Sequence, residues 1–163
     1  MAILLLADHD NATLSDQTAK ALTAASQIGS DVHVLVAGAG AKAAADAAAK
    51  LSGVSKVLVA DDASLANNLA EPLAALIVSL AGNYEAIVSA ATSVGKNVLP
   101  RVAALLDVAQ VSDVVEVKSP KIFVRPVYAG NALETVETSD KIIVATVRTT
   151  AFAAAGESGS API

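Results

Sequence analysis

The chain has 163 residues, a length that suits one domain with a substantial core. Its residues are 54% hydrophobic but only 2% aromatic, so the core must be built from Ala, Val, Leu and Ile. The net charge of −5 argues against a nucleic-acid-binding protein, and the absence of cysteine excludes disulfides and thiol chemistry.

Short apolar runs alternate with segments of helical periodicity in the first two-thirds of the chain. The apolar runs predict strands at residues 2–7, 32–37, 56–60 and 86–90. The other segments predict helices at residues 15–27, 41–50 and 69–81, and a fourth striped by Val98, Val102, Leu105 and Leu106. Continuous apolar strands between helices indicate an α/β fold: a parallel, Rossmann-like sheet with helices on both faces.

Two of the predicted helices carry signals at their ends. Gly29 is expected to stop the first helix. Asn68 and Glu71 resemble a capping box in front of the third helix. Pro72 falls in the first turn of that helix, where the missing N–H costs little.

The pattern changes after Asp107. Four more strands with short connections are predicted, at residues 114–118, 122–128, 132–137 and 141–147. The turn residues between them favour antiparallel strands that extend or edge the parallel core. Residues 1–150 are therefore expected to form one α/β domain, and residues 151–163 a linker-like tail.

The stretch ATSVGKNVLP, residues 91–100, has the outline of a phosphate-binding loop around Gly95 and Lys96. A Walker A loop needs G-x-x-x-x-G-K-[ST], but Ala90 stands at the first glycine position and Asn97 at the hydroxyl position. A P-loop is therefore rejected. Two interpretations remain: a generic anion site at a helix N-terminus, or a tight strand-to-helix turn, which is favoured.

A second glycine loop, residues 38–43, fits the dinucleotide pattern G-x-G-x-x-G/A through Gly38, Gly40 and Ala43. Asp61 and Asp62 follow about 20 residues later, where a ribose-binding acid belongs. The loop follows the second strand rather than the first, however, and Gly and Ala are abundant. A turn that packs against an Ala-rich helix is the favoured interpretation, and no NAD or FAD is expected there.

Polar residues after the first strand are also candidates for a site. Asp8, His9 and Asp10 lie where α/β folds place ligands, so they are compatible with a metal or acid–base role or with a solvated acidic loop, which is favoured. His33 is expected to be a partly buried or edge histidine within a strand.

Three arginines could anchor carboxylates or phosphates, but Arg101, Arg125 and Arg148 are expected to form surface or interface ion pairs. No arrangement of nucleophile, base and orienting residue is recognisable. The sequence therefore predicts no catalytic, cofactor-binding or metal-ligating residue.

The longest uncharged run, residues 72–84, is shorter than the roughly 20 apolar residues that span a bilayer. No membrane insertion is expected. The N-terminus MAILLLADHD lacks the features of a signal or transit peptide, so a cytoplasmic location of the bacterial type is expected.

Several segments resemble the alpha subunit of electron transfer flavoprotein. The most specific are GKNVLPRVAALLDVAQVSDVVEVKSP from Gly95, FVRPVYAGNALETVE and the closing VRTTAF. KVLVADD and the opening ILLLADHDN fit the same family, so the resemblance covers essentially the whole chain.

The resemblance implies a function as well as a fold. Members of this family carry electrons from flavin dehydrogenases, such as the acyl-CoA dehydrogenases of fatty acid β-oxidation, to a quinone reductase. The alpha subunit has an N-terminal α/β domain and a C-terminal domain that binds most of the FAD, and the beta subunit completes the heterodimer and carries AMP. This chain resembles the N-terminal domain alone, so no flavin residue maps onto it.

The resemblance thus implies a scaffold domain that packs on the beta subunit and, without the flavin domain, is inactive. Residues 114–148, with Phe123 and Tyr128, are expected to supply much of that interface. The alternative is a free-standing nucleotide-binding or sensing domain that uses the Gly38 or the Gly95 loop.

Overall fold

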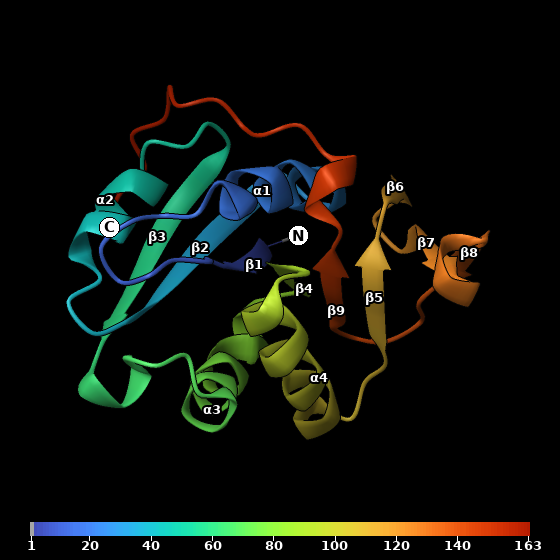
Figure 1. Cartoon of the computed structure of the whole chain (residues 1–163), viewed down its shortest axis with the longest axis horizontal. Helices are drawn as coiled ribbons and strands as arrows, with labels where there is room; N and C mark the ends of the chain where they lie inside the picture. The colour runs from blue at the N-terminus through green and yellow to red at the C-terminus, as the bar shows by residue number, and fades with distance from the viewer. Residues whose placement is uncertain (1) are drawn as a thin grey trace.

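A six-stranded parallel sheet forms the centre of the protein. The structure, a computed structural model, describes residues 2–163. The strand order is β3-β2-β1-β4-β9-β5, and every neighbouring pair is parallel. Figure 1 shows this order across the molecule, from β3 at one edge to β5 at the other. The strands are β1 (Ala2–Leu6), β2 (Asp31–Gly38), β3 (Val54–Asp61), β4 (Ala86–Ala90), β5 (Gln110–Val114) and β9 (Ile143–Val147).

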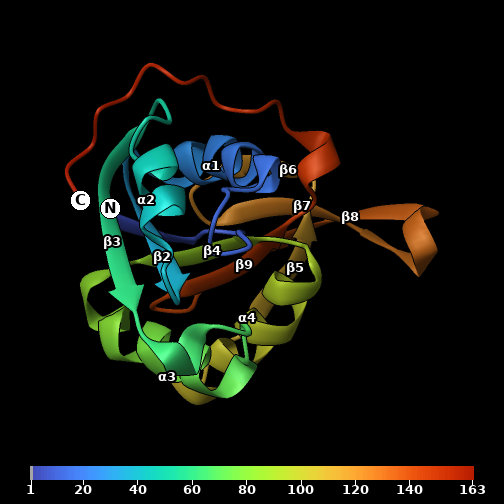
Figure 2. The same ribbon diagram turned by 60° about the vertical axis from the view of Figure 1, so that its left-hand side comes forward.

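Two pairs of helices cover opposite faces of the sheet, as predicted (Figure 2). On one face lie α1 (Asp16–Ile28) and α2 (Lys42–Ala48); on the other lie α3 (Ala70–Leu80) and α4 (Ser93–Leu106). Because side chains alternate along a strand, Leu4 packs in the α3–α4 core and Leu5 in the α1–α2 core, and both are fully buried. Coverage on both faces explains why the strands read as continuous apolar runs.

The α1–α2 core is built largely from alanine. Ala21, Ala24 and Ala25 of α1 and Ala44, Ala45 and Ala48 of α2 are fully buried. Small side chains let the helix backbones lie close to the sheet and to each other, which offsets the scarcity of large aromatic residues.

The helix ends follow local chemistry, with one correction. The Ser15 hydroxyl caps α1 by accepting the Gln17 N–H, and Gly29 ends that helix, as predicted. The predicted capping box before α3 is wrong: Leu69 is the N-cap residue, and no side chain caps the helix. Asn68 has a left-handed backbone with φ +51°. It lies in the turn before the helix, and its side chain accepts no hydrogen bond from an N–H group at the start of α3.

The C-terminal strands correct a second expectation. Residues 141–147 were expected to lie in an antiparallel arrangement, but β9 is parallel and lies between β4 and β5 inside the central sheet. All five of its residues are buried, which is the pattern of a parallel strand covered on both faces. The sequence prediction also missed β5, which precedes the strand expected at residue 114. The short turns favour hairpins, but the chain leaves the central sheet after β5 and returns to it at β9.

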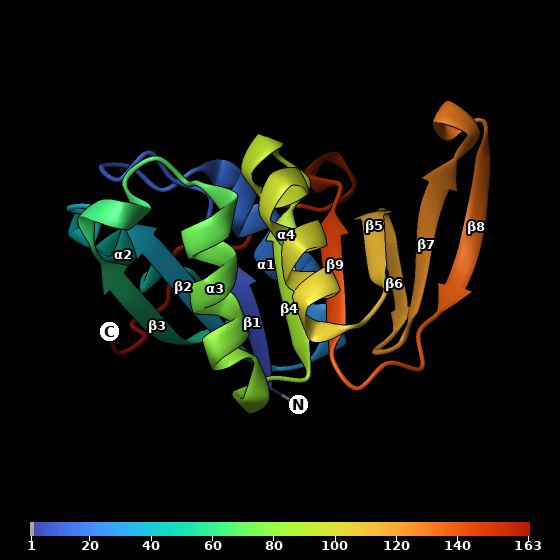
Figure 3. The same cartoon turned by 90° about the horizontal axis from the view of Figure 1, so that it is seen from below.

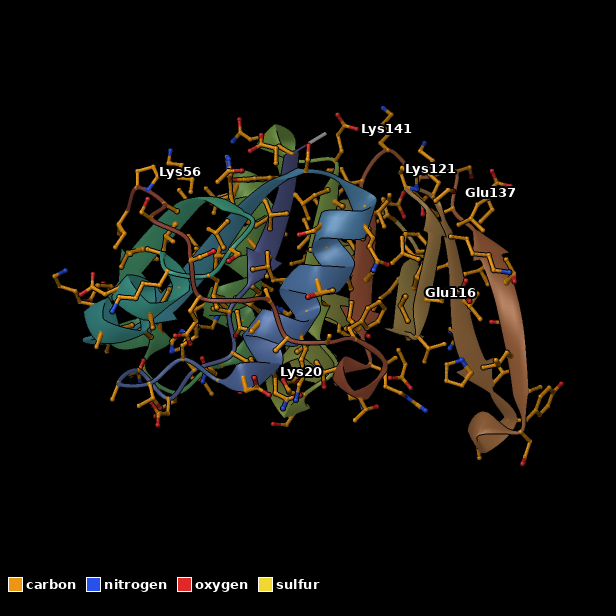
Figure 4. The ribbon with its side chains drawn as sticks, turned by 90° about the horizontal axis from the view of Figure 1, so that it is seen from above. Lys20, Lys56, Glu116, Lys121, Glu137 and Lys141 are labelled. Atoms are coloured by element: carbon orange, nitrogen blue, oxygen red, sulfur yellow. The ribbon has the colours of Figure 1, made fainter. Side chains whose placement is uncertain are left out.

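The segment between β5 and β9 forms a separate antiparallel sheet. For this segment the prediction of antiparallel strands after Asp107 is confirmed. Its order is β6 (Glu116–Ser119), β7 (Ile122–Val127) and β8 (Ala132–Glu137). Figure 3 shows the β7–β8 hairpin standing away from the central sheet. Figure 4 shows Lys121 and Glu137 at the end of this sheet opposite the hairpin tip.

The inner end of this small sheet is anchored to the main core. Phe123 of β7 is fully buried and packs with Val117 and Val136 in the α1–α2 core. Phe123 therefore fixes the small sheet to the body and is not available to a partner, in contrast to the expectation from sequence.

The residues after η4 (Thr149–Ala151) contain no helix or strand. They cross α1 and α2 in an extended path and end beside β3 (Figures 1 and 2). This path agrees with a linker-like composition, but the segment is hydrogen bonded to the domain along its length.

Candidate functional site

The carboxyl edge of the parallel sheet is where ligands bind in folds of this type, at the point where the strand order reverses. Here that point lies between β1 and β4, because β2 and β3 extend the sheet on one side and β4 begins the other. The loop after β1 carries Asp8, His9 and Asp10; after β4, Thr92 caps α4 and Gly95 lies in the first turn of that helix. Both sequence-predicted loops around Gly38 and Gly95 also lie at this edge.

The Gly95 turn packs tightly against the end of β4. A Cβ added to Gly95 would stand 2.0 Å from the Ala90 carbonyl oxygen and 2.4 Å from Ser89 Oγ. The Gly95 N–H donates to Thr92 Oγ1 at 3.4 Å, which caps α4. The crevice between this turn and the β1 loop leaves no volume for a water molecule. Gly95 therefore permits a close approach of helix to strand, which is the interpretation favoured by the sequence.

The Gly38 loop is closed by a side chain that the sequence analysis did not single out. Asn11 Oδ1 accepts the Ala39 N–H at 3.1 Å, and Asn11 Nδ2 donates to the Ala66 carbonyl at 3.2 Å. A Cβ on Gly38 would lie 2.1 Å from Asn11 Oδ1. The glycine thus makes room for Asn11 rather than for a pyrophosphate.

Asp61, the expected ribose-binding acid, is also used within the loop. Its Oδ1 accepts the Gly40 N–H at 2.8 Å, and Gly40 has φ +70°. The amides of Ala39 and Gly40, which a dinucleotide phosphate would need, therefore already have acceptors. Asp62 instead accepts the Ser64 N–H and hydroxyl, and these hydrogen bonds lower the pKa of its carboxyl group.

His9 holds Asn11, the residue that closes the Gly38 loop. It is only 7% exposed, and its Nδ1 accepts the Asn11 N–H at 3.1 Å. Burial is the main cause that lowers the pKa of His9 below its ordinary value of 6.5, which suits a neutral ring acting as an acceptor. The sequence pattern placed His9 at the correct edge but could not reveal that it holds a loop residue.

Asp10 forms a turn. Its Oδ1 accepts the N–H groups of Ala12 and Thr13, at 3.0 and 2.6 Å, and these bonds lower the pKa of Asp10. Among residues 2–163, no group of three or more His, Asp or Glu side chains is arranged to hold a metal ion.

His33 lies near the start of β2, at the amino ends of the strands and so away from the carboxyl edge that carries the glycine loops. Its Nδ1 is 2.9 Å from the Tyr84 hydroxyl, its Nε2 is 3.3 Å from Asp31 Oδ1, and its ring meets that of Tyr84 edge to face. Burial raises the pKa of Tyr84. These contacts fix the segment before β4 to β2, and His33 is partly buried, as expected.

Two of the three arginines form the ion pairs expected of them. Arg125 binds Glu134 across the β7–β8 pair at 2.6 Å and donates to the Ser112 carbonyl at 2.9 Å. Arg148, after β9, pairs with Asp113 of β5, which raises the pKa of the guanidinium. Arg101 is exposed on α4.

The tip of the β7–β8 hairpin is the most exposed apolar part of the chain. Tyr128 is 82% exposed and Leu133 is 67% exposed. Tyr128 and Ala129 both have left-handed backbones, with φ +49° and +55°, and Gly130 follows with φ +88°. Such conformations are uncommon for residues other than glycine and concentrate at functional sites. The turn thus holds a tyrosine ring out in solvent at the end of a projecting hairpin.

The described residues thus define a Rossmann-like α/β domain in which both glycine loops are closed by the protein's own groups. A family model described as "Electron transfer flavoprotein domain" matches residues 3–163. The chain belongs to the electron transfer flavoprotein family, as its sequence motifs indicated.

Individual relatives agree with this assignment. The chain is 66% identical to the electron transfer flavoprotein subunit alpha of Bradyrhizobium diazoefficiens, with 100% of the chain and 52% of the relative aligned. It is 56% identical to the same subunit of Pseudomonas aeruginosa, over 100% of the chain and 53% of the relative. A probable mitochondrial alpha subunit of Caenorhabditis elegans is 44% identical, over 98% of the chain and 49% of the relative.

The chain spans about half the length of the curated relatives it matches. No helix within residues 2–163 combines the length and the apolar character needed to cross a membrane.

Proposed function

We propose that this chain is the scaffold and subunit-packing domain of an electron transfer flavoprotein. The complex carries electrons from flavin dehydrogenases, such as acyl-CoA dehydrogenases, to a quinone reductase in the cytoplasm of a bacterium. The observation that carries the proposal is the family match over residues 3–163, in a domain whose Gly95 crevice has no volume for a ligand and whose Gly38 loop amides already bond to Asn11 and Asp61.

The residues present do not fit a flavin. A cavity of about 500 Å³ lies between α1, α2 and the tail, but its charged residues are Asp16 and Glu157, which would repel a pyrophosphate. A second cavity, of about 340 Å³, contains Arg125, which is already bonded to Glu134 and the Ser112 carbonyl. FAD in this proposal is held by the part of the alpha subunit that this chain does not span, and AMP by the beta subunit.

The projecting sheet is the proposed packing surface. Exposed tyrosine is enriched among the residues that dominate binding energy, and its rigid ring loses little conformational entropy on binding. Tyr128 lies in the turn that joins β7 and β8, and Leu133 is the second residue of β8, whereas Phe123 is near the start of β7 and is buried in the core. In this proposal, the tip of the β7–β8 hairpin contacts the beta subunit, while the opposite end of the small sheet stays packed on this domain through Phe123.

The test is binding to the beta subunit, measured by titration calorimetry. Tyr128→Asn removes the ring but keeps a residue that tolerates the left-handed backbone. At a binding hot spot it weakens affinity by ~10-fold or more. Leu105→Ala, which shortens an exposed apolar side chain on α4 outside the projecting sheet, is the matched control and leaves affinity unchanged. Unchanged affinity in Tyr128→Asn places the interface elsewhere, whereas no complex with the wild-type chain refutes the scaffold function itself.

A free-standing nucleotide-binding domain is the alternative function. Asn11 and Asp61 occupy the amides of the Gly38 loop, and Gly95 packs directly on Ala90, so neither loop favours it.

A further inference from the structure

We propose that residues 155–162 form a strap that opens and closes as a unit while the rest of the domain stays folded. The strap crosses α1 and α2 and reaches the edge strand β3 (Figure 2). This inference rests on the path and contacts of the segment itself, and it is independent of the proposed function.

Main-chain hydrogen bonds hold the strap at three places. The Ala155 N–H donates to the Ala19 carbonyl of α1 at 3.0 Å. Over the turn between α2 and β3, the strap exchanges three further main-chain bonds: Ser52 N–H to the Gly156 carbonyl, Gly159 N–H to the Lys50 carbonyl and Ala161 N–H to the Ala49 carbonyl. The Ser158 N–H also donates to the side-chain oxygen Ser52 Oγ. At its end, the Pro162 carbonyl accepts the Val57 N–H of β3 at 2.8 Å.

Gly159 determines how closely the strap fits. A Cβ at this position would stand 2.4 Å from the Leu51 carbonyl oxygen and 2.9 Å from the Leu51 carbonyl carbon. Both are backbone atoms of the turn beneath the strap, so they cannot move aside as a flexible side chain would. The glycine therefore serves a close contact between two backbones rather than a flexible linker.

The strap is held without a large apolar anchor. Within residues 155–162, only Ala155, Gly159 and Ala161 are partly buried, and the others are exposed. Segments with few buried apolar contacts and solvent-accessible hydrogen bonds open at lower free energies than core strands. The contacts therefore predict a closed strap that opens locally.

Opening changes two surfaces of the domain. It frees the Val57 N–H on β3, the outermost strand of the sheet, and unpaired edge groups are templates for pairing with another chain. It also removes Ala155 and Glu157 from the wall of the 500 Å³ cavity beside α1 and α2. The strap thus controls access to the sheet edge and to this cavity together.

Amide hydrogen exchange on the purified chain tests this. In the wild type, the amides of Ser52, Val57, Ala155, Gly159 and Ala161 should exchange at a common rate that is faster than the rate of the β1 and β4 amides. Gly159→Ala should accelerate the strap amides together by ~10-fold or more, because overpacking against fixed backbone opposes closure. The β1 and β4 amides should keep their wild-type rates.

Gly82→Ala is the matched control, because nothing lies within 4 Å of the Cβ it would add. It should leave the strap amides unchanged. Strap amides that exchange as slowly as β1 and β4 in the wild type would overturn the proposal. So would an unchanged strap in Gly159→Ala, or an equal acceleration of strap and core, which means opening only by global unfolding.

Discussion

Asn11 Oδ1 lies directly in front of Gly38, so that a Cβ on Gly38 would be 2.1 Å away from it. The two residues are 27 positions apart in the sequence: Asn11 lies in the loop after β1, and Gly38 is the last residue of the neighbouring strand β2. The side-chain amide of Asn11 occupies the space that a side chain at position 38 would need. The sequence still matches the dinucleotide pattern at Gly38, but Asn11 occupies the position in front of Gly38 that a bound pyrophosphate would need.

Gly38→Ala should lower the free energy of unfolding by about 1–3 kcal/mol, because the added methyl group overlaps Asn11. In an Asn11→Ala background, the same substitution should cost less, since the overlapping oxygen is gone. Urea unfolding of the four proteins measures both costs. Equal costs in the two backgrounds would show that Asn11 is not what excludes a side chain at position 38.

NAD, AMP and ATP should leave the melting temperature of the wild-type chain unchanged. A nucleotide present at 100 times its Kd would add about 2.7 kcal/mol to stability, which thermal unfolding detects readily. If NAD does stabilise the chain and Gly40→Val abolishes the effect, the nucleotide-binding alternative replaces the scaffold function.

Gly95→Ala should destabilise the domain by about 1–3 kcal/mol, because the new Cβ would overlap the Ala90 carbonyl and Ser89 Oγ. Gly82→Ala, which meets no atom within 4 Å, provides the comparison. Denaturant unfolding of both variants measures the difference. Similar stabilities would refute the close approach of α4 to β4.

The stability of the chain should depend on pH through His9. Its pKa is lowered in the folded state, so between that value and about 6.5 the unfolded chain binds more protons. The contribution of His9 to the free energy of unfolding is therefore fully present above pH 6.5 and is lost as the pH is lowered through this window. Urea unfolding at pH 7.5 and 5.5 measures the loss.

His9→Asn places an amide oxygen near the position of Nδ1 and removes the titrating group. It should reduce the loss of stability between these two pH values. The lowered pKa values of Asp10 and Asp62 act in a separate window, below 3.8, and do not interfere. An identical pH dependence in His9→Asn and the wild type would exclude His9 as its source.

The purified chain should be colourless and should transfer no electrons on its own. Flavin chemistry requires a protein site that binds and orients the ring, and in the proposed function that site lies in the part of the alpha subunit that this chain does not span. A visible absorption spectrum followed by flavin release measures the bound cofactor. A stoichiometric yellow chromophore in residues 1–163 would refute the scaffold function.

Local patterns predicted the elements whose signals are local. The four helices and the first four strands followed from periodicity and apolar runs, and the Rossmann-like class followed from their alternation. The direction of β9 could not be read in the same way, because IVATV is compatible with either direction and its partners β4 and β5 lie far away in the sequence.

The candidate site shows the same limit. The glycines at 38 and 95 were visible as motifs, but their meaning depends on Asn11 and Ala90, which approach them only in the folded chain. The tail is a similar case, since its composition is that of a linker and only its backbone contacts with the folded domain, including those of Gly159, distinguish it from one.

The position of β9 has a consequence for biosynthesis. A ribosome completes β4 and β5 well before β9, yet β9 separates them in the finished sheet. A nascent chain that has emerged only as far as β8 therefore leaves the edges of β4 and β5 that pair with β9 without a partner strand. Pairings over such sequence separations form slowly and leave edges open to misassembly. Folding of this domain during translation should stall before Ile143 emerges and should be completed by a single late insertion.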